Sequence, residues 1–467
     1  MNKTAIQQLA EFVCNTPRER HPTASIERAG FALLDTLGCM LLGAESEVAR
    51  VSRQAVAGWG EGNASIIGSG IRLPAPWAAL SNGAAAHALD IDDYTFIAND
   101  HPSAVMLPAL LAACSGRERD ISGSDLIDAY LIGLEVIFTL GEAVNMGHYK
   151  LGWHTTSTID SLGATAAICR LDGLDCAQTV AALSLTTSLG SGYVSQFGTS
   201  GKPLHAGFAA KAGLLAASLG AAGATGYIGA LDGPVSFASL LVPQGEADFD
   251  SALGKMGEPW GIEEHGLGAK VYPSCGYAHR AVDAALAARA ELGLDDINQI
   301  ESVAASLPDF HLAVLPYGVP RDRTEALFSA PFCVATALAT GGNRIEDFSE
   351  QAISREEILQ LTERVKVSGR KTRRPELNFD PEDPDIVEVR LVDGRSARCE
   401  VPIYTGAPGR DLDRDDFVAK FADCHRHFLD AGGDAGLAVD AMIEAALGIA
   451  DAPDLVALFE AFCATAE

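Results

Sequence analysis

Long apolar segments rich in alanine dominate residues 1–268 and predict helices. Their apolar positions recur every three or four residues or nearly surround the segment, as in helices that are half or fully buried. The alternation of apolar and polar residues that marks a strand is almost absent here. We therefore expect an all-helical domain, with helices at about 3–16, 26–44, 74–90, 103–115, 124–146, 157–170, 176–190 and 205–222.

Local signals support several of these helix boundaries. Ser25 is a suitable N-terminal cap for the helix at 26–44, and Pro74 and Pro76 lie near the start of the helix at 74–90. Asp125 falls in the first turn of the helix at 124–146, where a carboxylate suits the helix dipole. Because small residues recur along these segments, we expect the helices to approach one another closely, backbone to backbone.

The pattern changes near residue 270, where β-branched residues begin to alternate with polar ones. Strands are predicted at 298–307 and 364–369, and residues 385–401 are predicted to form a hairpin. Its two strands are joined at Asp393-Gly394, a dipeptide that favours a type I′ turn. Helices are expected between the strands, at 279–292, 324–340 and 354–363.

The order of these elements predicts a mostly α protein of two domains. Helices are expected again near the C-terminus, at 413–428, 435–448 and 453–464. We expect them to rejoin the first domain, so that residues 1–268 and 405–467 form one large helical domain. Residues 269–404 would then be a smaller inserted α+β lid domain. A chain of 467 residues is also too long for one ordinary core.

Composition narrows the class of partner and the compartment. A net charge of −28 argues against nucleic acid or an anionic membrane as a partner, although local lysines can still bind a small anion. No apolar run reaches the ~18 residues of a spanning helix, and the polar N-terminal segment does not resemble a signal peptide. The 10 cysteines include no CxxC pair, so we expect a reducing, cytoplasmic location.

Candidate chemistry begins at an acid-rich break between two predicted helices. Asp90, Asp92 and Asp93 fall within four positions, and His101 follows before the next helix. Unpaired buried charge costs several kcal/mol, so such a cluster between buried helices indicates a site. The alternative is a helix end with solvated caps and a histidine on the following turn.

Three further histidines lie in or beside breaks rich in Gly, Ser and Thr: His154, His205 and His279. His154 directly precedes a helix that Thr156 or Ser157 would cap. There the helix dipole disfavours the protonated ring, which leaves a neutral base. An ordinary loop histidine is the alternative. Lys202 lies in a glycine-rich turn that suits an anion, although the turn lacks the spacing of a phosphate-binding loop.

The segment that opens the predicted lid domain also carries reactive side chains. Lys270 and Cys275 lie at the domain junction, and a nearby cation would make the thiol reactive. A buried structural thiol is the alternative for Cys275. Tyr317 lies in a loop at 316–323 that could cover a site, with Tyr317 as a substrate-binding residue, or could simply be a solvated surface loop.

Metal binding is a rival interpretation of the same residues. His101, His154 and the aspartates could hold an ion, as in a metal-dependent hydrolase, yet the sequence contains neither HExxH nor a pair of histidines four residues apart. The run from Cys424 to His427 also suggests a metal. On a helix its side chains would point in different directions, so an exposed helix face is favoured.

Four motifs, taken together and in order, identify a family resemblance. They are HALDIDD with HPSAVMLPALLA, GWHTTSTIDSLGATAA, GTSGKPLHAGFAAKAG and KVYPSCGYAHRAVDA. This combination resembles the MmgE/PrpD family, which includes 2-methylcitrate dehydratase, cis-aconitate decarboxylase and iminodisuccinate epimerase. The resemblance implies a helical domain built from both chain ends, a smaller α+β lid domain, a homodimer, and no metal or organic cofactor.

The resemblance also implies roles for individual residues. Asp90, His101, His154, Lys202 and Lys270 would face the substrate. Cys275 stands where relatives have a Cys or a His, and Thr95 fills the place of a family threonine, with a longer spacing to His101. Thr155 departs from the family by replacing a proline. Among the subfamilies, GHYKLGWHTTST and GEPWGI are more similar to the epimerase branch.

The chemistry of the family explains these residue types. Removing a proton beside a carboxylate builds negative charge, which the ammonium groups of Lys202 and Lys270 can stabilise. A neutral histidine can move the proton. We therefore expect a cofactor-independent lyase or isomerase, similar to 2-methylcitrate dehydratase, that acts on a small di- or tricarboxylic acid. The alternatives are an iminodisuccinate-type epimerase with Cys275 as a second base, a metal-dependent hydrolase, and a helical binding protein without catalysis.

Overall fold

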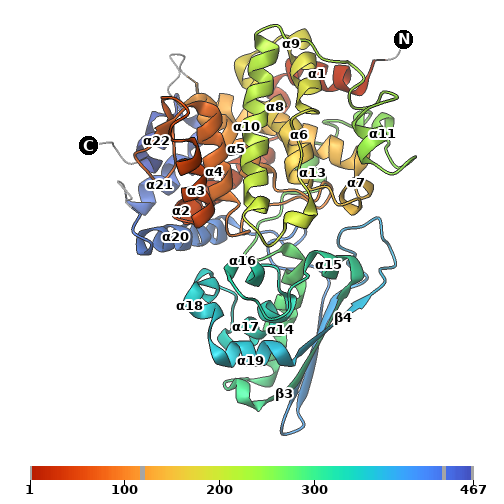
Figure 1. The fold of residues 1–467 in the computed structure, drawn as a ribbon, viewed down its shortest axis with the longest axis vertical. Helices are drawn as coiled ribbons and strands as arrows, with labels where there is room; N and C mark the ends of the chain where they lie inside the picture. The colour runs from red at the N-terminus through yellow and green to blue at the C-terminus, as the bar shows by residue number, and fades with distance from the viewer. Residues whose placement is uncertain (1–2, 116–120, 434–437, 464–467) are drawn as a thin grey trace.

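The computed structural model describes residues 3–115, 121–433 and 438–463. They form two bodies, a large helical one and a smaller one built on a sheet (Figure 1). Helices from both ends of the chain, α1 (Ala5–Asn15) and α22 (Val456–Phe462), belong to the helical body. The mostly α fold predicted from the sequence is confirmed.

The helical body contains the long helices that the apolar pattern predicts. They are α2 (Thr23–Ala44), α3 (Glu47–Val56), α4 (Ala75–Ala86), α5 (Pro102–Cys114), α6 (Gly123–Val144), α8 (Thr155–Asp172), α9 (Cys176–Thr186), α10 (Gly201–Ala221), α20 (Arg414–Asp430) and α21 (Val439–Leu447). Shorter elements complete it: α7 (Gly147–Lys150), α11 (Phe237–Leu241), α12 (Phe249–Leu253), α13 (Gly261–Glu264), and a small antiparallel pair, β1 (Ala64–Ser65) and β2 (Arg72–Leu73). The first residues predicted for the helix at 435–448, and the last one of 453–464, lie outside the described residues.

Several helix ends differ from the prediction for local reasons. α2 begins after Pro22, so Ser25, the predicted cap, is buried inside the first turn. α4 ends at Ala86 with His87 as its C-cap rather than at residue 90, and Asp90, further along the loop, adopts a left-handed φ of +55°. Neither Thr156 nor Ser157 caps α8, which starts at Thr155 with His154 as its N-cap. Asp125 does lie in the first turn of α6, within a capping box with Ser122.

Glycines allow the helices to approach closely, as the small-residue pattern predicts. A Cβ atom on Gly207 of α10 would lie 2.2 Å from the carbonyl oxygen of Leu80 in α4. A Cβ atom on Gly83 would lie 2.9 Å from the Cα atom of Gly207. The two helices therefore cross backbone to backbone, which brings the end of α4 beside the start of α10.

The α+β domain is built on a four-stranded sheet of order β4-β3-β5-β6. β3 pairs in parallel with β4, while the pairs β3–β5 and β5–β6 are antiparallel. The strands are β3 (Ile300–Pro308), β4 (Val365–Arg370), β5 (Asp385–Leu391) and β6 (Ser396–Val401). The domain's helices are α14 (His279–Leu292), α15 (Asp309–Val314), α16 (Arg323–Ala326), α17 (Ala330–Thr340), α18 (Glu350–Ile353) and α19 (Glu356–Arg364).

Two details of this domain correct the prediction. The helix expected at 324–340 is broken into α16 and α17, because Ser329 caps α17 with its hydroxyl oxygen. The hairpin turn is not of type I′, which needs two residues with positive φ. Gly394 has a φ of +89° but Asp393 does not, and the backbone N–H of Gly394 donates to the Leu391 carbonyl. This is a three-residue loop that ends in a glycine bulge.

Each body has its own large apolar core. One core joins residues of α1 to α13 with residues of α20 to α22, and the other is centred on the sheet with α14 and α17. The two chain connections lie side by side, since the Ala269 N–H donates to the Gly406 carbonyl at 2.8 Å. Domain boundaries at 268/269 and 404/405 stay a prediction.

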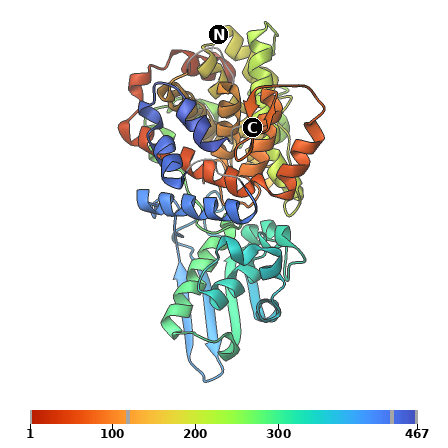
Figure 2. The same cartoon turned by 90° about the vertical axis from the view of Figure 1, so that its left-hand side faces the viewer.

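A buried ion pair ties the C-terminal segment to the N-terminal one. The ammonium of Lys420 in α20 lies 2.6 Å from a carboxylate oxygen of Asp35 in α2. It also donates to the Ile91 carbonyl in the loop after α4, at 2.7 Å. Figure 2 shows α20 lying across the helical body on the side that faces the α+β domain. α20 therefore supports the acid-rich loop from behind.

No single helix of the described residues is long and apolar enough to cross a membrane. Helices α2 and α3 together have the length and composition of a spanning segment, but they are bent by 81° relative to each other. Most of α2 is also buried in the core.

Candidate active site

A cavity lies where the two domains meet. It encloses about 450 Å³ of empty space, its open mouth included. The loop between α4 and α5, the starts of α8 and α10, and the connection into the α+β domain supply its walls. Seven of the predicted site residues line it: Asp90, Thr95, His101, His154, Lys202, Lys270 and Cys275.

Two lysines from different segments converge on Asp90. The Lys202 ammonium, in the first turn of α10, donates to Asp90 Oδ1 at 2.8 Å. The Lys270 ammonium donates to the same oxygen, and to the Asp90 carbonyl at 3.0 Å. All three side chains are buried. Burial alone would raise the pKa of the Asp90 carboxyl, but the two lysines outweigh it and hold that pKa well below its usual range.

One positive charge therefore exceeds what Asp90 neutralises. Two ammonium groups share a single carboxylate oxygen, and Asp90 Oδ2 has no hydrogen-bond partner within the described part of the chain. Burial lowers the pKa of Lys202, while the nearby Asp90 carboxylate raises it. Asp92 also acts on Lys202, and although burial would raise the pKa of Asp92, His87 and His101 hold it well below its usual range. This second buried carboxylate offsets the remaining ammonium charge.

His101 is held in one tautomer by its neighbours. Its Nδ1 lies 2.8 Å from the Asp93 carbonyl oxygen and 3.3 Å from Asp92 Oδ2. Both neighbours are acceptors, so Nδ1 carries the hydrogen and Nε2 keeps its lone pair. Nε2 lies 3.8 Å from Asp90 Oδ1. Burial, followed by Lys270, lowers the pKa of His101 to about 3, which leaves a neutral ring whose Nε2 can accept a proton.

His154 pairs with His205 of α10. Their Nδ1 atoms are 2.9 Å apart, so one donates and the other accepts. Burial, with His205 next in effect, lowers the pKa of His154 well below its usual range. Burial also lowers the pKa of His205 to about 4. Both rings are therefore neutral near pH 7, and the tautomer of one sets that of the other.

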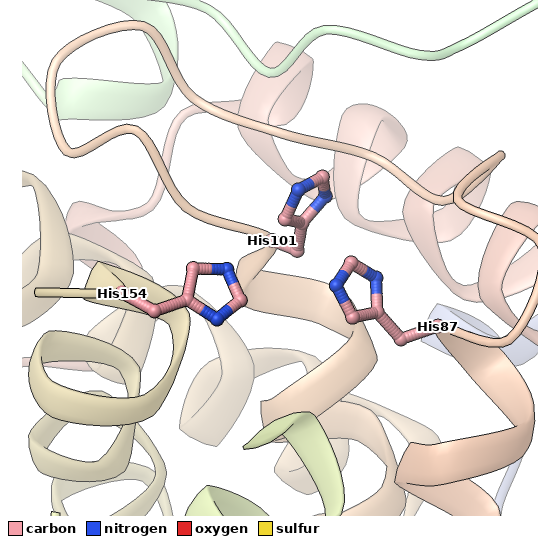
Figure 3. Close-up of side chains that lie close together, drawn as sticks. All are labelled: His87, His101 and His154. Carbon is pink, nitrogen blue, oxygen red and sulfur yellow. The ribbon is translucent and has the colours of Figure 1, made fainter. Parts of the chain in front are cut away.

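A third histidine, His87, completes a cluster with His101 and His154. Figure 3 shows the three side chains close together. His87 Nδ1 lies 2.8 Å from Asp92 Oδ2, and its Nε2 is buried without a hydrogen-bond partner among the described residues. His87 is a site residue that the motifs did not single out. The sequence could have revealed it, because His87 begins the motif HALDIDD and lies three residues before Asp90.

This cluster has a spacing that a metal could use. Ligand atoms of His87, His101 and His154 lie within 4.8 Å of one another. Ligand atoms of His87, Asp90, Asp92 and His101 lie equally close together. The ammonium groups of Lys202 and Lys270 at Asp90 oppose a cation there and favour an anion. In the run from Cys424 to His427, Cys424 is buried and Arg426 is exposed, so these side chains diverge as the sequence predicts.

Cys275 and Tyr317 occupy different surroundings. Cys275 lines the cavity, and its burial raises the pKa of the thiol to about 11, so this environment favours the protonated form. Tyr317 does not line the cavity. Its hydroxyl donates to the Phe197 carbonyl at 3.3 Å and lies against Gly198, so it joins the α+β domain to the turn before α10. A substrate-binding role for Tyr317 stays a prediction.

Several lining residues could not be foreseen from the motifs. Asn378 and Phe379 reach the cavity from a distant segment, and Tyr404 comes from the connection back to the helical domain. Tyr149 also lines the cavity, and although it stands in GHYKLGWHTTST it was given no role. Asn378 and Phe379 lie in a loop without regular structure, where no periodic pattern exists. His279 does not line the cavity, because its ring Nε2 bonds to the Ser274 carbonyl instead.

Comparison with known families identifies the class of this enzyme. The sequence model of the MmgE/PrpD N-terminal domain matches residues 7–250, and that of the MmgE/PrpD C-terminal domain matches residues 272–443. Together they cover most of the chain, and the resemblance seen in the motifs is confirmed. The protein belongs to the MmgE/PrpD family and is an enzyme of that type.

Characterised relatives are similar along most of their length. Cis-aconitate decarboxylase of Homo sapiens is 28% identical over 405 residues, which cover 85% of this chain and 82% of the relative. The mouse protein of the same name is 27% identical over 406 residues, covering 85% and 81%. Cis-aconitate decarboxylase of Aspergillus terreus is 26% identical over 386 residues, or 77% of each chain.

Proposed function

We propose that the protein is a cofactor-independent lyase that acts on a small di- or tricarboxylic acid by proton transfer next to a carboxylate. The observation that carries this proposal is the convergence of two buried ammonium groups and one neutral histidine on a single cavity. The ammonium groups would bind the substrate carboxylate and hold the charge that develops on it. His101 would move the proton.

Each residue then has a chemical role. Lys202 and Lys270 stabilise the enolate-like charge, and such preorganised groups supply about 3–4 kcal/mol each. Asp90 holds the two lysines together. His101 Nε2 is the acid–base group, worth a factor of about 10²–10⁴. His154, oriented by His205, is the second proton-transfer group. Thr95 and Cys275 contact the substrate from the cavity wall.

Two lyase reactions fit these roles. In a decarboxylation, the bond to one carboxylate breaks, carbon dioxide leaves, and the electron pair is held by the remaining carboxylate until a proton arrives. In a dehydration, the base removes a proton beside the carboxylate and an acid protonates the leaving hydroxyl. Relatives that are cis-aconitate decarboxylases support a carboxylic acid lyase, whether decarboxylase or dehydratase-like.

Two alternatives are separated by simple measurements. An iminodisuccinate-type epimerase needs a second base on the opposite face of the carbon. The raised pKa of Cys275 favours His154 for that task. A metal-dependent hydrolase would contain stoichiometric metal and lose activity on chelation. We propose that neither a metal nor an organic cofactor is required.

A panel of polycarboxylic acids in deuterated water tests the proposal. Proton NMR would follow both net turnover and exchange of hydrogen next to a carboxylate. Turnover with deuterium in the product identifies a lyase, whereas exchange with inversion and no net loss of mass identifies an epimerase. The proposal fails if the protein binds an acid but neither transforms it nor exchanges its hydrogen.

We further propose a homodimer that works in the cytoplasm. Phe208, Leu215 and Leu219 form an exposed apolar stripe along α10, and Trp59 with Trp77 extends it towards α4. A contiguous apolar surface of this kind favours an interface with another chain. All 10 cysteines are free thiols, which suits a reducing compartment. The charge of −28 disfavours nucleic acid and membrane partners.

A further inference from the structure

The buried carboxylate of Asp92 is shared by two imidazole rings. His87 Nδ1 lies 2.8 Å from Asp92 Oδ2, and His101 Nδ1 lies 3.3 Å from the same oxygen. The side chains of His87 and Asp92 have no exposed surface. An ionised carboxylate only accepts hydrogen bonds, so both Nδ1 atoms carry their hydrogen towards it. Asp92 is therefore a common acceptor that joins His87 to His101.

The fold places His87 beside His101 without placing it in the cavity. His87 is the C-cap of α4, and its backbone N–H donates to the Gly83 carbonyl at 3.2 Å. Its ring centroid lies 4.4 Å from that of His101, as Figure 3 shows. Within the described part of the chain, the cavity lining includes neither His87 nor Asp92. His87 therefore reaches the reaction through other side chains rather than by touching a substrate.

His87 is the side chain that fixes the orientation of the Asp92 carboxylate. Asp92 Oδ1 is buried and has no hydrogen-bond partner within the described ranges, so the orientation depends on the contacts of Oδ2. The contact with His87 is the shorter of the two, and His101 also donates to the Asp93 carbonyl at 2.8 Å. Without the His87 donor, the carboxylate would be free to turn away from His101.

We propose that His87 is a positioning residue, which holds Asp92 Oδ2 against His101 Nδ1 so that Asp92 fixes the tautomer of His101 and stabilises its charged form. This role rests on the proposed lyase function. When His101 Nε2 takes a proton from the carbon next to the substrate carboxylate, the electron pair of that C–H bond stays on the substrate. The ring then carries a positive charge, which the Asp92 carboxylate balances from 3.3 Å away. Return of the proton reverses both changes.

The charge state of His87 suits this role. Burial lowers the pKa of His87 more than Asp92 raises it, so the ring is neutral near pH 7. A neutral ring donates from Nδ1 without cancelling the carboxylate charge, which remains beside His101. An imidazolium at His87 would instead compete with His101 for the same carboxylate. Burial of His87 therefore keeps Asp92 effective towards the base.

Two substitutions at His87 separate its donor from its bulk. His87→Asn keeps a donor, because the amide nitrogen can take the place of Nδ1, whereas His87→Leu fills the space without one. We expect kcat to fall about 10–100-fold in His87→Leu and to stay near the wild-type value in His87→Asn. KM should change little in either variant, because His87 lies outside the cavity lining. Asp92 is left intact, since it also acts on Lys202.

His21→Leu is the matched control. His21 is another buried histidine that contacts a carboxylate, with Nε2 2.7 Å from Asp128 Oδ1, and it lies outside the cavity lining within the described residues. This variant should lower the melting temperature while keeping kcat, as expected for a purely structural contact. Full kcat in His87→Leu, or an equal loss of kcat in His87→Leu and His87→Asn, overturns the positioning role.

Nitrogen NMR of protein labelled with ¹⁵N-histidine gives a readout that does not depend on turnover or on the folding of His87→Leu. In wild type, both His87 and His101 should have the hydrogen on Nδ1, and the His87 signals are those absent from His87→Asn. His101 should keep this tautomer in His87→Asn. A wild-type His87 with its hydrogen on Nε2 alone overturns the proposal.

The positioning role and the lyase function can fail separately. Wild-type protein that turns over no carboxylic acid refutes the function, and the tautomers are still measured by NMR. Wild-type turnover that persists at full kcat in His87→Leu refutes the positioning role alone.

Discussion

At the residue scale, hydrogen-bond partners rather than residue types define the chemistry of the site. His101 is a useful base because two oxygen acceptors fix the hydrogen on Nδ1, which leaves Nε2 free towards Asp90. His279 has the same ring, but its Nε2 is bound to a carbonyl at the N-terminus of α14. Their position in breaks between helices nominated both histidines, and only the family resemblance singled out His101.

The pH dependence of kcat/KM tests His101 as the base. Burial and Lys270 lower its pKa to about 3, so the ring stays neutral, and the base active, far below the usual histidine value of about 6.5. The enzyme's own acid limb should therefore lie below about pH 5, once protonation of the substrate is accounted for. An acid limb near pH 6.5 that disappears in His101→Gln would contradict this electrostatic account.

Lys202→Met tests the anion-binding role of the lysines. The variant keeps the length of the side chain but removes one of the two ammonium groups at Asp90. The transition state should therefore lose about 2 kcal/mol or more of stabilisation, which is measured as a lower kcat/KM. Lys255→Met is the control, because its ammonium lies on the surface of the helical body beside Glu142. Steady-state kinetics with an accepted carboxylic acid measures both. Equal kinetics for the two variants would exclude Lys202 from binding the substrate.

At the element scale, α20 connects the distant C-terminal segment to the active-site loop. The periodic pattern predicted its helix and its return to the first domain. It could not predict that Lys420 would bridge Asp35 and the Ile91 carbonyl, because those partners are more than 300 residues away in the chain. The left-handed backbone conformation of Asp90 could not be predicted either, because the pattern of apolar positions carries no information about φ.

Lys420→Met should therefore affect both stability and activity. It leaves the buried Asp35 carboxylate unpaired, which costs about 3–5 kcal/mol, and it releases the loop that holds Asp90 and His101. Urea unfolding and kcat/KM measure the two effects. Arg426→Met is the matched control on the same helix, since its ion pairs are exposed and should contribute at most about 1 kcal/mol. Equal stability of the two variants would show that the Asp35 pair contributes little.

At the scale of the whole molecule, the sequence could predict a helical part and a sheet-containing part but not the cavity between them. Seven of the eight proposed site residues line it, and six of these seven stand in the quoted motifs, whereas Asn378, Phe379 and Tyr404 come from segments without a pattern. A cavity between two domains is made by long-range packing, and its full lining follows only from the three-dimensional arrangement.

The apolar stripe on α10 predicts a dimer at this scale. Light scattering at micromolar concentration should give twice the monomer mass of 48.8 kDa. Leu215→Asp should shift the protein towards monomer, because it places a charge in an apolar interface. Leu151→Asp is a control, as an exposed apolar residue outside α10. A monomeric wild type would refute the interface.

The most direct test of the central claim is hydrogen exchange and turnover of polycarboxylic acids, cis-aconitate included, in deuterated water with metal-free protein. The account predicts turnover of at least one acid, with deuterium entering next to a carboxylate. Lys202→Met and His101→Gln should lose this activity, while Lys255→Met keeps it. Turnover that appears only after a metal is added, or that persists in both site variants, would contradict the account.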